Sequence, residues 1–252
     1  MLWNIPIDVC EGKGFLNMIK QLLFYNFRYF SRSHKFIVPL VIYLAAFAVL
    51  YATKPLEVMN TYGMTAMLTF IIAVLVAYSF MEIEDPVQQQ IVLLSLRNDN
   101  LYYFSKVFFV WIIVSIMSFI LVLYPAIFGF FNSSINFGYI IVALIGHLLL
   151  GFLGICVSVL FNSRLFKNRQ FAVLMLIIIV LVSVVQKAII LKSPATKWVL
   201  YILPPVSLVV DRITNFAGSK NMVPLFLAFG ISIVYSFGLL VAFIKLMKTK
   251  VF

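Results

Sequence analysis

Six long apolar segments constrain the fold of this chain more than any other feature of its sequence. They cover residues 36–53, 62–81, 107–128, 138–161, 171–191 and 223–244. A helix of about 20 apolar residues crosses the roughly 30 Å hydrocarbon core of a bilayer, so each segment can span it with some tilt. Lipid accepts only helices and closed barrels, and continuous apolar runs lack the alternation of barrel strands. We therefore expect an all-α membrane protein with six transmembrane helices.

The composition leaves little room for a water-soluble domain. Hydrophobic residues make up 64% of the 252 residues and charged residues only 11%, and a soluble protein could not bury so much apolar surface. One membrane domain, residues 36–252, takes up most of the length and follows an N-terminal segment, residues 1–35. This segment lacks the continuous apolar core of a secretory signal, so we expect it to be retained. Within it, residues 14–31 place apolar side chains at helical spacing, which predicts an amphipathic helix in the membrane interface.

The positions of Lys and Arg predict the orientation of the spans. Thirteen of them lie in the N-terminal segment, in the loops between spans two and three and between spans four and five, and in the C-terminal tail. The positive-inside rule then places both termini in the cytoplasm of a multi-pass cell-membrane protein. The region 187–222 is an exception, with five basic residues on the expected outer side. Pro204 and Pro205 interrupt its apolar stretch, so we expect short re-entrant helices over about 195–216 at the outer interface.

Several classes of function are excluded by the side chains that the sequence lacks. The net charge of +11 does not indicate nucleic-acid binding, because the basic residues are scattered among apolar spans instead of forming a basic domain. The cysteines Cys10 and Cys156 and the histidines His34 and His147 are too few for a disulfide framework or a Cys/His zinc site. We expect this chain to bind no cofactor and no metal.

The loop between the second and third spans predicts a short cytoplasmic helix over 86–96. Asp85 can cap the free N–H groups of its first turn, and proline favours the first helical position. The helix would place apolar side chains on one face, suited to a groove on a cytoplasmic partner. Acidic residues near its positive end could bind a metal, but capping is the simpler assignment. The residues expected to couple the chain to a partner are Glu82, Glu84, Asp85, Pro86, Val87, Gln90, Ile91 and Leu94.

In this arrangement the sequence resembles the permease subunits of ABC-2 type ABC transporters, over nearly its full length. Residues 14–31, 86–96 and 195–216 occupy the places of that family's connecting helix, coupling helix and re-entrant helices, and residues 82–106 look like its loop into the third span. The resemblance implies two paired six-span subunits, as a homodimer or heterodimer. It also implies two copies of an ATP-binding subunit, which hold ATP and Mg, into which the coupling helices insert.

The chain itself has no sequence pattern for ATP hydrolysis. The phosphate-binding pattern Gly-x4-Gly-Lys-Ser/Thr is absent, and Gly12-Lys13 stands alone without the loop that cradles phosphates. We expect a non-catalytic membrane subunit that depends on a separate ATPase.

A few polar residues inside the spans are candidates for a substrate path. Thr61, Thr65 and Thr69 line one face of the second span, where they border a path or bond to carbonyls of their own helix. Ser183 and Gln186 lie near the end of the fifth span, where the resemblance implies that they meet substrate. His147 is the only histidine in a span, and a neutral packing role is favoured over a place in a transport path.

The leading hypothesis is the permease subunit of an ATP-driven exporter of an amphipathic peptide or lipid-like substrate. Small members of the resembling family include exporters of antimicrobial peptides and of phenol-soluble modulins. The alternatives are a membrane-embedded enzyme and an ion-coupled transporter. An enzyme would need clustered acids, histidines or a nucleophile with its base, and an ion-coupled transporter would need broken helices at matching places in two halves.

Overall fold

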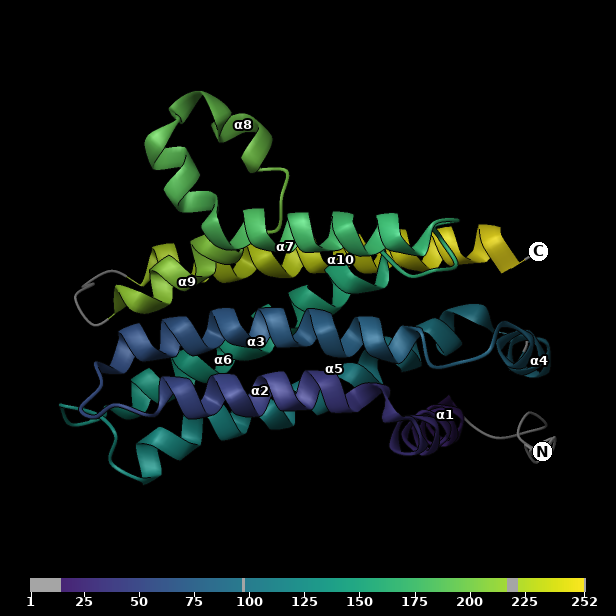
Figure 1. Ribbon diagram of the computed structural model, residues 1–252, viewed down its shortest axis with the longest axis horizontal. Helices are drawn as coiled ribbons and strands as arrows, with labels where there is room; N and C mark the ends of the chain where they lie inside the picture. The colour runs from purple at the N-terminus through teal and green to yellow at the C-terminus, as the bar shows by residue number, and fades with distance from the viewer. Residues whose placement is uncertain (1–14, 97, 217–221, 252) are drawn as a thin grey trace.

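The computed structural model describes residues 15–96, 98–216 and 222–251, and these fold into α-helices joined by short turns (Figure 1). The long helices are α3 (Val58–Met81), α5 (Asp99–Ile127), α6 (Phe137–Val159), α7 (Arg169–Lys192) and α10 (Val223–Val251). The shorter ones are α1 (Phe15–Arg32), η2 (His34–Phe36), α2 (Ile37–Leu50), α4 (Pro86–Leu96), η3 (Pro194–Thr196), α8 (Lys197–Leu200) and α9 (Val206–Thr214). Among the described residues there is no β-strand, only an isolated bridge between Leu56 and Phe131.

Five helices of the described chain are long and apolar enough to cross a membrane, namely α3, α5, α6, α7 and α10. The first predicted span is shorter than expected, because α2 has 14 residues and begins at Ile37 after the single turn of η2. The count becomes six when α1 and the following His34–Leu50 segment are taken as one bent span, with 76° between the two parts. The chain is therefore an all-helical protein of multi-pass membrane character.

Helix α3 is the centre of the bundle and packs most closely against α6. A Cβ atom on Gly154 of α6 would meet the carbonyl oxygen of Phe70 at 2.6 Å, so the close approach of the two helices depends on glycine at this position. One turn later the Ser158 hydroxyl donates to the carbonyl of Val74 at 2.9 Å. Gly154 and Ser158 are thus small residues that permit close contact between α3 and α6.

The predicted region 195–216 contains two short helices with the proline pair between them. Helix α8 stands away from the bundle in Figure 1, whereas α9 packs into it. Val206, Val209 and Ile213 of α9 are fully buried, and Thr214 lies so close to Gly63 of α3 that a Cβ there would clash. The short helices are therefore present, and α9 is part of the core.

Two helices run across the direction of the long ones at the end of the bundle opposite α8 and α9. Figure 1 shows α1 and α4 nearly end-on while α2 and α3 lie lengthwise. The turn between α6 and α7 reaches the same end, where Arg164 bonds to the carbonyl of Glu84 at 2.9 Å. We call this region, with α1, α4 and that turn, the α4 end, and the opposite region the α8 end.

Candidate functional site

The site is built on α4, whose start is set by two residues. Helix α4 begins at Pro86, and the Asp85 carboxylate accepts a hydrogen bond from the Val87 N–H at 2.8 Å. The predicted helix and its cap are therefore confirmed.

The two sides of α4 differ in their surroundings. Val87, Ile91 and Leu94 have exposed fractions of 64%, 53% and 71% and follow one another at the spacing of a single helix face. Gln90 lies exposed among them. The opposite side is buried through Gln89, Val92, Leu93 and Leu96. An apolar face is thus left uncovered on a helix whose other face is fixed to the bundle.

Glutamine side chains attach the buried side of α4 to its neighbours. The Gln89 amide donates to the Tyr103 hydroxyl of α5 at 3.1 Å. Gln88 accepts from the Tyr29 hydroxyl of α1 at 2.6 Å. Two of the three consecutive glutamines of this helix, Gln88 and Gln89, therefore hold α4 in place.

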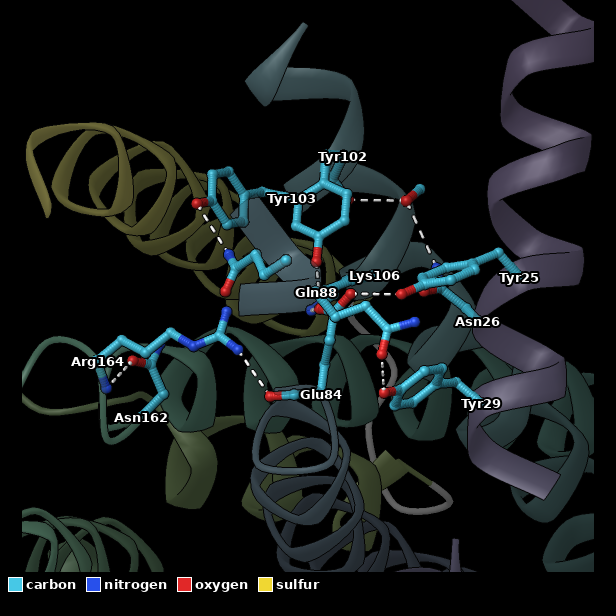
Figure 2. Close-up of polar contacts among 12 residues, drawn as sticks. Tyr25, Asn26, Tyr29, Glu84, Gln88, Tyr102, Tyr103, Lys106, Asn162 and Arg164 are labelled. Carbon is cyan, nitrogen blue, oxygen red and sulfur yellow. Dashed lines mark hydrogen bonds and ion pairs between the residues drawn. The ribbon is translucent and has the colours of Figure 1, made fainter. Parts of the chain in front are cut away.

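Glu84, just before α4, is the centre of a buried polar cluster (Figure 2). Only 7% of this residue is exposed, and its carboxylate forms an ion pair with the Lys106 ammonium of α5. The same carboxylate accepts from the Tyr102 hydroxyl and, at 2.6 Å, from the Tyr25 hydroxyl of α1. Burial alone would raise the pKa of the Glu84 carboxyl, but the Lys106 charge and the donated hydrogen bonds hold that pKa below its ordinary value. Glu84 is thus a charged group in the folded protein.

The pKa values of the tyrosine hydroxyls near Glu84 are shifted in the opposite direction, upward. Burial raises the pKa of Tyr25, and the neighbouring Glu84 charge raises it further. The pKa of Tyr29 is raised by the same two causes, in the same order. Both hydroxyls are therefore protonated at neutral pH, and Tyr25 donates to the Glu84 carboxylate while Tyr29 donates to the Gln88 amide oxygen.

A second set of contacts joins Glu82 to the turn between α6 and α7. The Ser163 N–H donates to the Glu82 carboxylate at 2.9 Å, and Arg169 lies 3.8 Å from it. Lys35 donates to the Glu82 carbonyl from the start of the η2–α2 segment. With the Arg164 bond to the Glu84 carbonyl, four residues hold the link between α3 and α4, and they come from η2, the α6–α7 turn and the start of α7.

The structure divides the residues expected to act in coupling into two groups. Asp85, Pro86, Val87, Gln90, Ile91 and Leu94 are exposed. Glu82 and Glu84 instead point into the protein, with side chains exposed by 7% and 4%. The two glutamates hold α4 in position and cannot offer their carboxylates to a partner surface.

Sequence analysis missed the partners of Glu84, although a signal for them exists. Tyr25 and Tyr29 are four residues apart on α1, and Tyr102 and Lys106 are four residues apart on α5. Polar pairs at this spacing share one helix face, and such faces on otherwise apolar helices need polar partners. Arg164, which bonds to the Glu84 carbonyl, had been used only as one of the basic residues that predict the orientation of the spans.

The threonines considered for a substrate path make contacts typical of packing. Thr61, Thr65 and Thr69 donate to the carbonyls of Glu57, Thr61 and Thr65 at 2.6, 3.0 and 2.9 Å, and all three are buried. His147 of α6 is fully buried and lies 3.0 Å from the Thr65 hydroxyl oxygen. Its other ring nitrogen donates to the Ala143 carbonyl at 2.7 Å, since a carbonyl only accepts. These contacts favour the packing role for the threonines and for His147.

The two candidates at the end of α7 are buried as well. Ser183 donates to the carbonyl of Ile179 at 2.6 Å. Gln186, exposed by 4%, donates to the Leu200 carbonyl of α8 at 2.6 Å and accepts from the Ser207 hydroxyl of α9 at 3.1 Å. Gln186 therefore ties the three helices of the α8 end together.

Within the described ranges, no group of three or more His, Cys, Asp or Glu side chains could hold a metal ion. In comparisons with known proteins, the chain matches no family model, no curated protein and no solved structure. Its function is therefore argued from the geometry of α4 and the Glu84 cluster.

Proposed function

We propose that this chain is the permease subunit of an ATP-driven exporter of the ABC-2 type and that α4 docks into a separate ATP-binding subunit. The observation that carries the proposal is the uncovered apolar face of α4, formed by Val87, Ile91 and Leu94 at the end of the bundle. Anchors at i, i+4 and i+7 are the pattern by which a helix fits a hydrophobic groove. The rigid attachment of the buried side would let movement of the partner reach the long helices.

The charges at the two ends support a cytoplasmic location for α4. The α4 end carries the exposed basic residues Lys20, Arg28, Lys35, Lys167, Arg169, Lys245 and Lys248. In the described ranges the α8 end carries fewer, namely Lys54, Lys187, Lys192, Lys197 and Arg212. Under the positive-inside rule the α4 end faces the cytoplasm, where an ATPase would be found. Six crossings of the cell membrane, with α2 as the first, would leave both termini on that side.

The substrate would be an amphipathic peptide or a lipid-like molecule, exported by a pair of such subunits. In the described chain the long helices contain few charged side chains, and Lys106 is already paired with Glu84. Ion-coupled transporters and membrane enzymes depend on clustered ionisable groups inside the membrane. The small number of such groups in the described long helices favours a hydrophobic cargo.

The proposal is tested by placing charge on the uncovered face of α4. The double change Ile91→Asp and Leu94→Asp would bury two unpaired carboxylates in the docked complex, which costs several kcal/mol. We expect binding to the cognate ATP-binding subunit, sought among the products of neighbouring genes, to weaken by a factor on the order of 100, with loss of substrate-stimulated ATP hydrolysis. Binding is measured by co-purification in detergent and hydrolysis in reconstituted vesicles.

A matched control adds two negative charges at the same end but away from that face. Asn100 of α5 and Gln170 of α7 are both exposed, and Asn100→Asp with Gln170→Glu should leave assembly and hydrolysis unchanged. Unchanged assembly of the Ile91→Asp and Leu94→Asp variant would rule out docking through α4. ATP hydrolysis by the purified chain alone would contradict the assignment of the ATPase to a partner.

A further inference from the structure

Helix α1 presents a stripe of alternating apolar and basic residues on its uncovered side. Leu16, Lys20, Phe24 and Arg28 follow at intervals of four residues and are all exposed, with Phe27 beside them. The exposed fractions of Leu16, Phe24 and Phe27 are 80%, 60% and 57%. We call these five residues the α1 stripe. Side chains at this spacing lie above one another on one helix face, so the stripe is a continuous surface.

The opposite side of α1 is packed against the protein and includes the contacts of the candidate site. Leu22 and Asn26 are buried, and Asn26 lies 3.5 Å from the Ser105 hydroxyl of α5. Tyr25 and Tyr29 reach Glu84 and Gln88 from this helix. Packing within the chain therefore accounts for one side of α1 and leaves the stripe unexplained.

We propose that the α1 stripe binds the anionic headgroups of the membrane leaflet at the α4 end. Helix α1 carries Lys20, Arg28 and Arg32 and no acidic residue, so its charge complements an anionic surface. The guanidinium of Arg28 lies 5.8 Å from the centre of the Phe24 ring, which places a cation next to an apolar anchor. Basic groups at headgroup level with aromatic and aliphatic groups just below them are the features of an interfacial helix.

The position of α1 next to α2 fits a helix that lies at the level of the lipid headgroups. Helix α1 ends at Arg32, and the His34–Leu50 segment follows after a bend of 76°. The first turns of α2 expose Ile37, Val38 and Leu40, as expected for residues entering lipid. A helix that turns through a large angle directly before an apolar segment lies along the membrane surface, and Figure 1 shows α1 crossing the direction of α2. The stripe is thus continuous with the lipid-facing surface.

A consequence for the candidate site follows from the two sides of α1. The stripe would hold the helix against anionic lipid, while Tyr25 and Tyr29 hold the start of α4. Binding of anionic lipid would therefore stabilise the Glu84 cluster. The proposal does not depend on an ATP-binding partner, because the lipid contact is a property of this chain alone.

The test compares the full chain in nanodiscs of phosphatidylcholine alone with nanodiscs that also contain phosphatidylglycerol. Hydrogen exchange of the α1 amides is measured by mass spectrometry. Each basic residue near an anionic surface contributes a factor of about five in binding, so phosphatidylglycerol should slow α1 exchange on the order of tenfold. The double change Lys20→Gln and Arg28→Gln should abolish this difference, because both side chains are exposed and their loss leaves the packed side intact.

The matched control removes two basic residues from the same end of the bundle but from another helix. Lys245 and Lys248 of α10 are exposed, and Lys245→Gln with Lys248→Gln should keep the full phosphatidylglycerol effect on α1. Added salt should reduce the effect, since it screens exposed charges. Equal exchange of α1 in both kinds of nanodisc would overturn the proposal. Loss of the lipid effect in the control variant would also overturn it, because the effect would then reflect net charge and not the stripe.

Discussion

Each end of the helix bundle has a buried polar side chain that joins several helices, and the two side chains differ in charge. At the α4 end, Glu84 binds Lys106, Tyr102 and Tyr25 through its carboxylate. At the α8 end, the neutral amide of Gln186 binds the Leu200 carbonyl and the Ser207 hydroxyl. Both side chains are nearly inaccessible, so neither end can exchange its contacts for water without opening.

The difference in charge makes the two ends respond differently to a lost contact. A buried carboxylate needs its counter-ion and its donors together, because removing one partner leaves a charge in a medium of low dielectric constant. A buried amide that loses a partner leaves only a neutral dipole unpaired, which costs less. The α4 end is therefore suited to move as one unit, as the proposed docking to an ATP-binding subunit requires. The α8 end can rearrange at lower cost.

The largest effect is expected from removing the counter-ion at the α4 end. Lys106→Met leaves the Glu84 carboxylate buried without its cation and should lower the free energy of unfolding by about 3–5 kcal/mol. The measurement is reversible unfolding in detergent micelles. Combining it with Glu84→Gln should recover part of this loss, because the unpaired charge is then gone.

Lys35→Met serves as the control for the loss of a lysine at this end. Lys35 is exposed and donates to a backbone carbonyl of Glu82, so its removal should cost less than about 1 kcal/mol. If Lys106→Met were no more destabilising than Lys35→Met, the two ends would not differ in the way described.

A smaller effect is expected from acid, and only at the α4 end. Because the pKa of Glu84 is lower in the folded protein than its ordinary value of 4.5, its contribution to stability is complete above that value. The contribution is lost as the pH falls below 4.5 toward the folded pKa, where the carboxyl becomes protonated. Protonation leaves the buried Lys106 ammonium without its counter-ion, but Glu84 is only partly protonated above its folded pKa, so the loss there should be smaller than in Lys106→Met.

The acid effect is measured as the pH dependence of unfolding, with hydrogen exchange reporting on each end separately. Glu84→Gln should flatten the acid limb for α4 amides, whereas Gln186→Leu should leave that limb unchanged. An acid limb that persists in Glu84→Gln would assign it to another carboxyl group.

Much of the fold could be predicted from the sequence because each feature depends on local pattern. Apolar length predicted the five long helices, and the Asp85–Pro86 pair predicted where α4 begins. The first span was predicted too long, since its hydropathy continues to Thr53 whereas α2 ends at Leu50. Lys54 and Pro55 mark the end of the apolar run, but α2 stops at Leu50, before either of them, and apolar composition does not show that earlier end.

The candidate site could be predicted only on its exposed side. The apolar face of α4 follows from spacing within one helix, whereas the Glu84 cluster joins residues up to 80 positions apart. Glutamates before a helix N-terminus fit capping equally well, so their position alone does not indicate that Glu84 points inward. Only the packing of α1 against α5 brings Tyr25 and Lys106 to the same carboxylate.

At the α8 end, we expect an effect on stability that is smaller than that of Lys106→Met but larger than that of breaking a surface ion pair. Gln186→Leu leaves the Leu200 carbonyl and the Ser207 hydroxyl without their partner and should cost about 1–3 kcal/mol of unfolding free energy. Exchange of amides in η3 and α8 should become faster. Gln170→Leu on the same helix is the control, because Gln170 is exposed and should show neither change. A cost equal to that of Lys106→Met would remove the contrast between charged and neutral ends.

The smallest effect is expected from the ion pair at the surface of the α8 end. Lys187 of α7 pairs with Asp211 of α9, but their side chains are 51% and 24% exposed. Solvent screens such a pair, so Lys187→Gln should change the unfolding free energy by less than about 1 kcal/mol. A double-mutant cycle with Asp211→Asn measures the coupling directly, and the same cycle on Lys106 and Glu84 provides the comparison. Since both cycles remove one lysine and one carboxylate, a coupling at Lys187 as large as that at Lys106 would show that burial is not what separates the two ends.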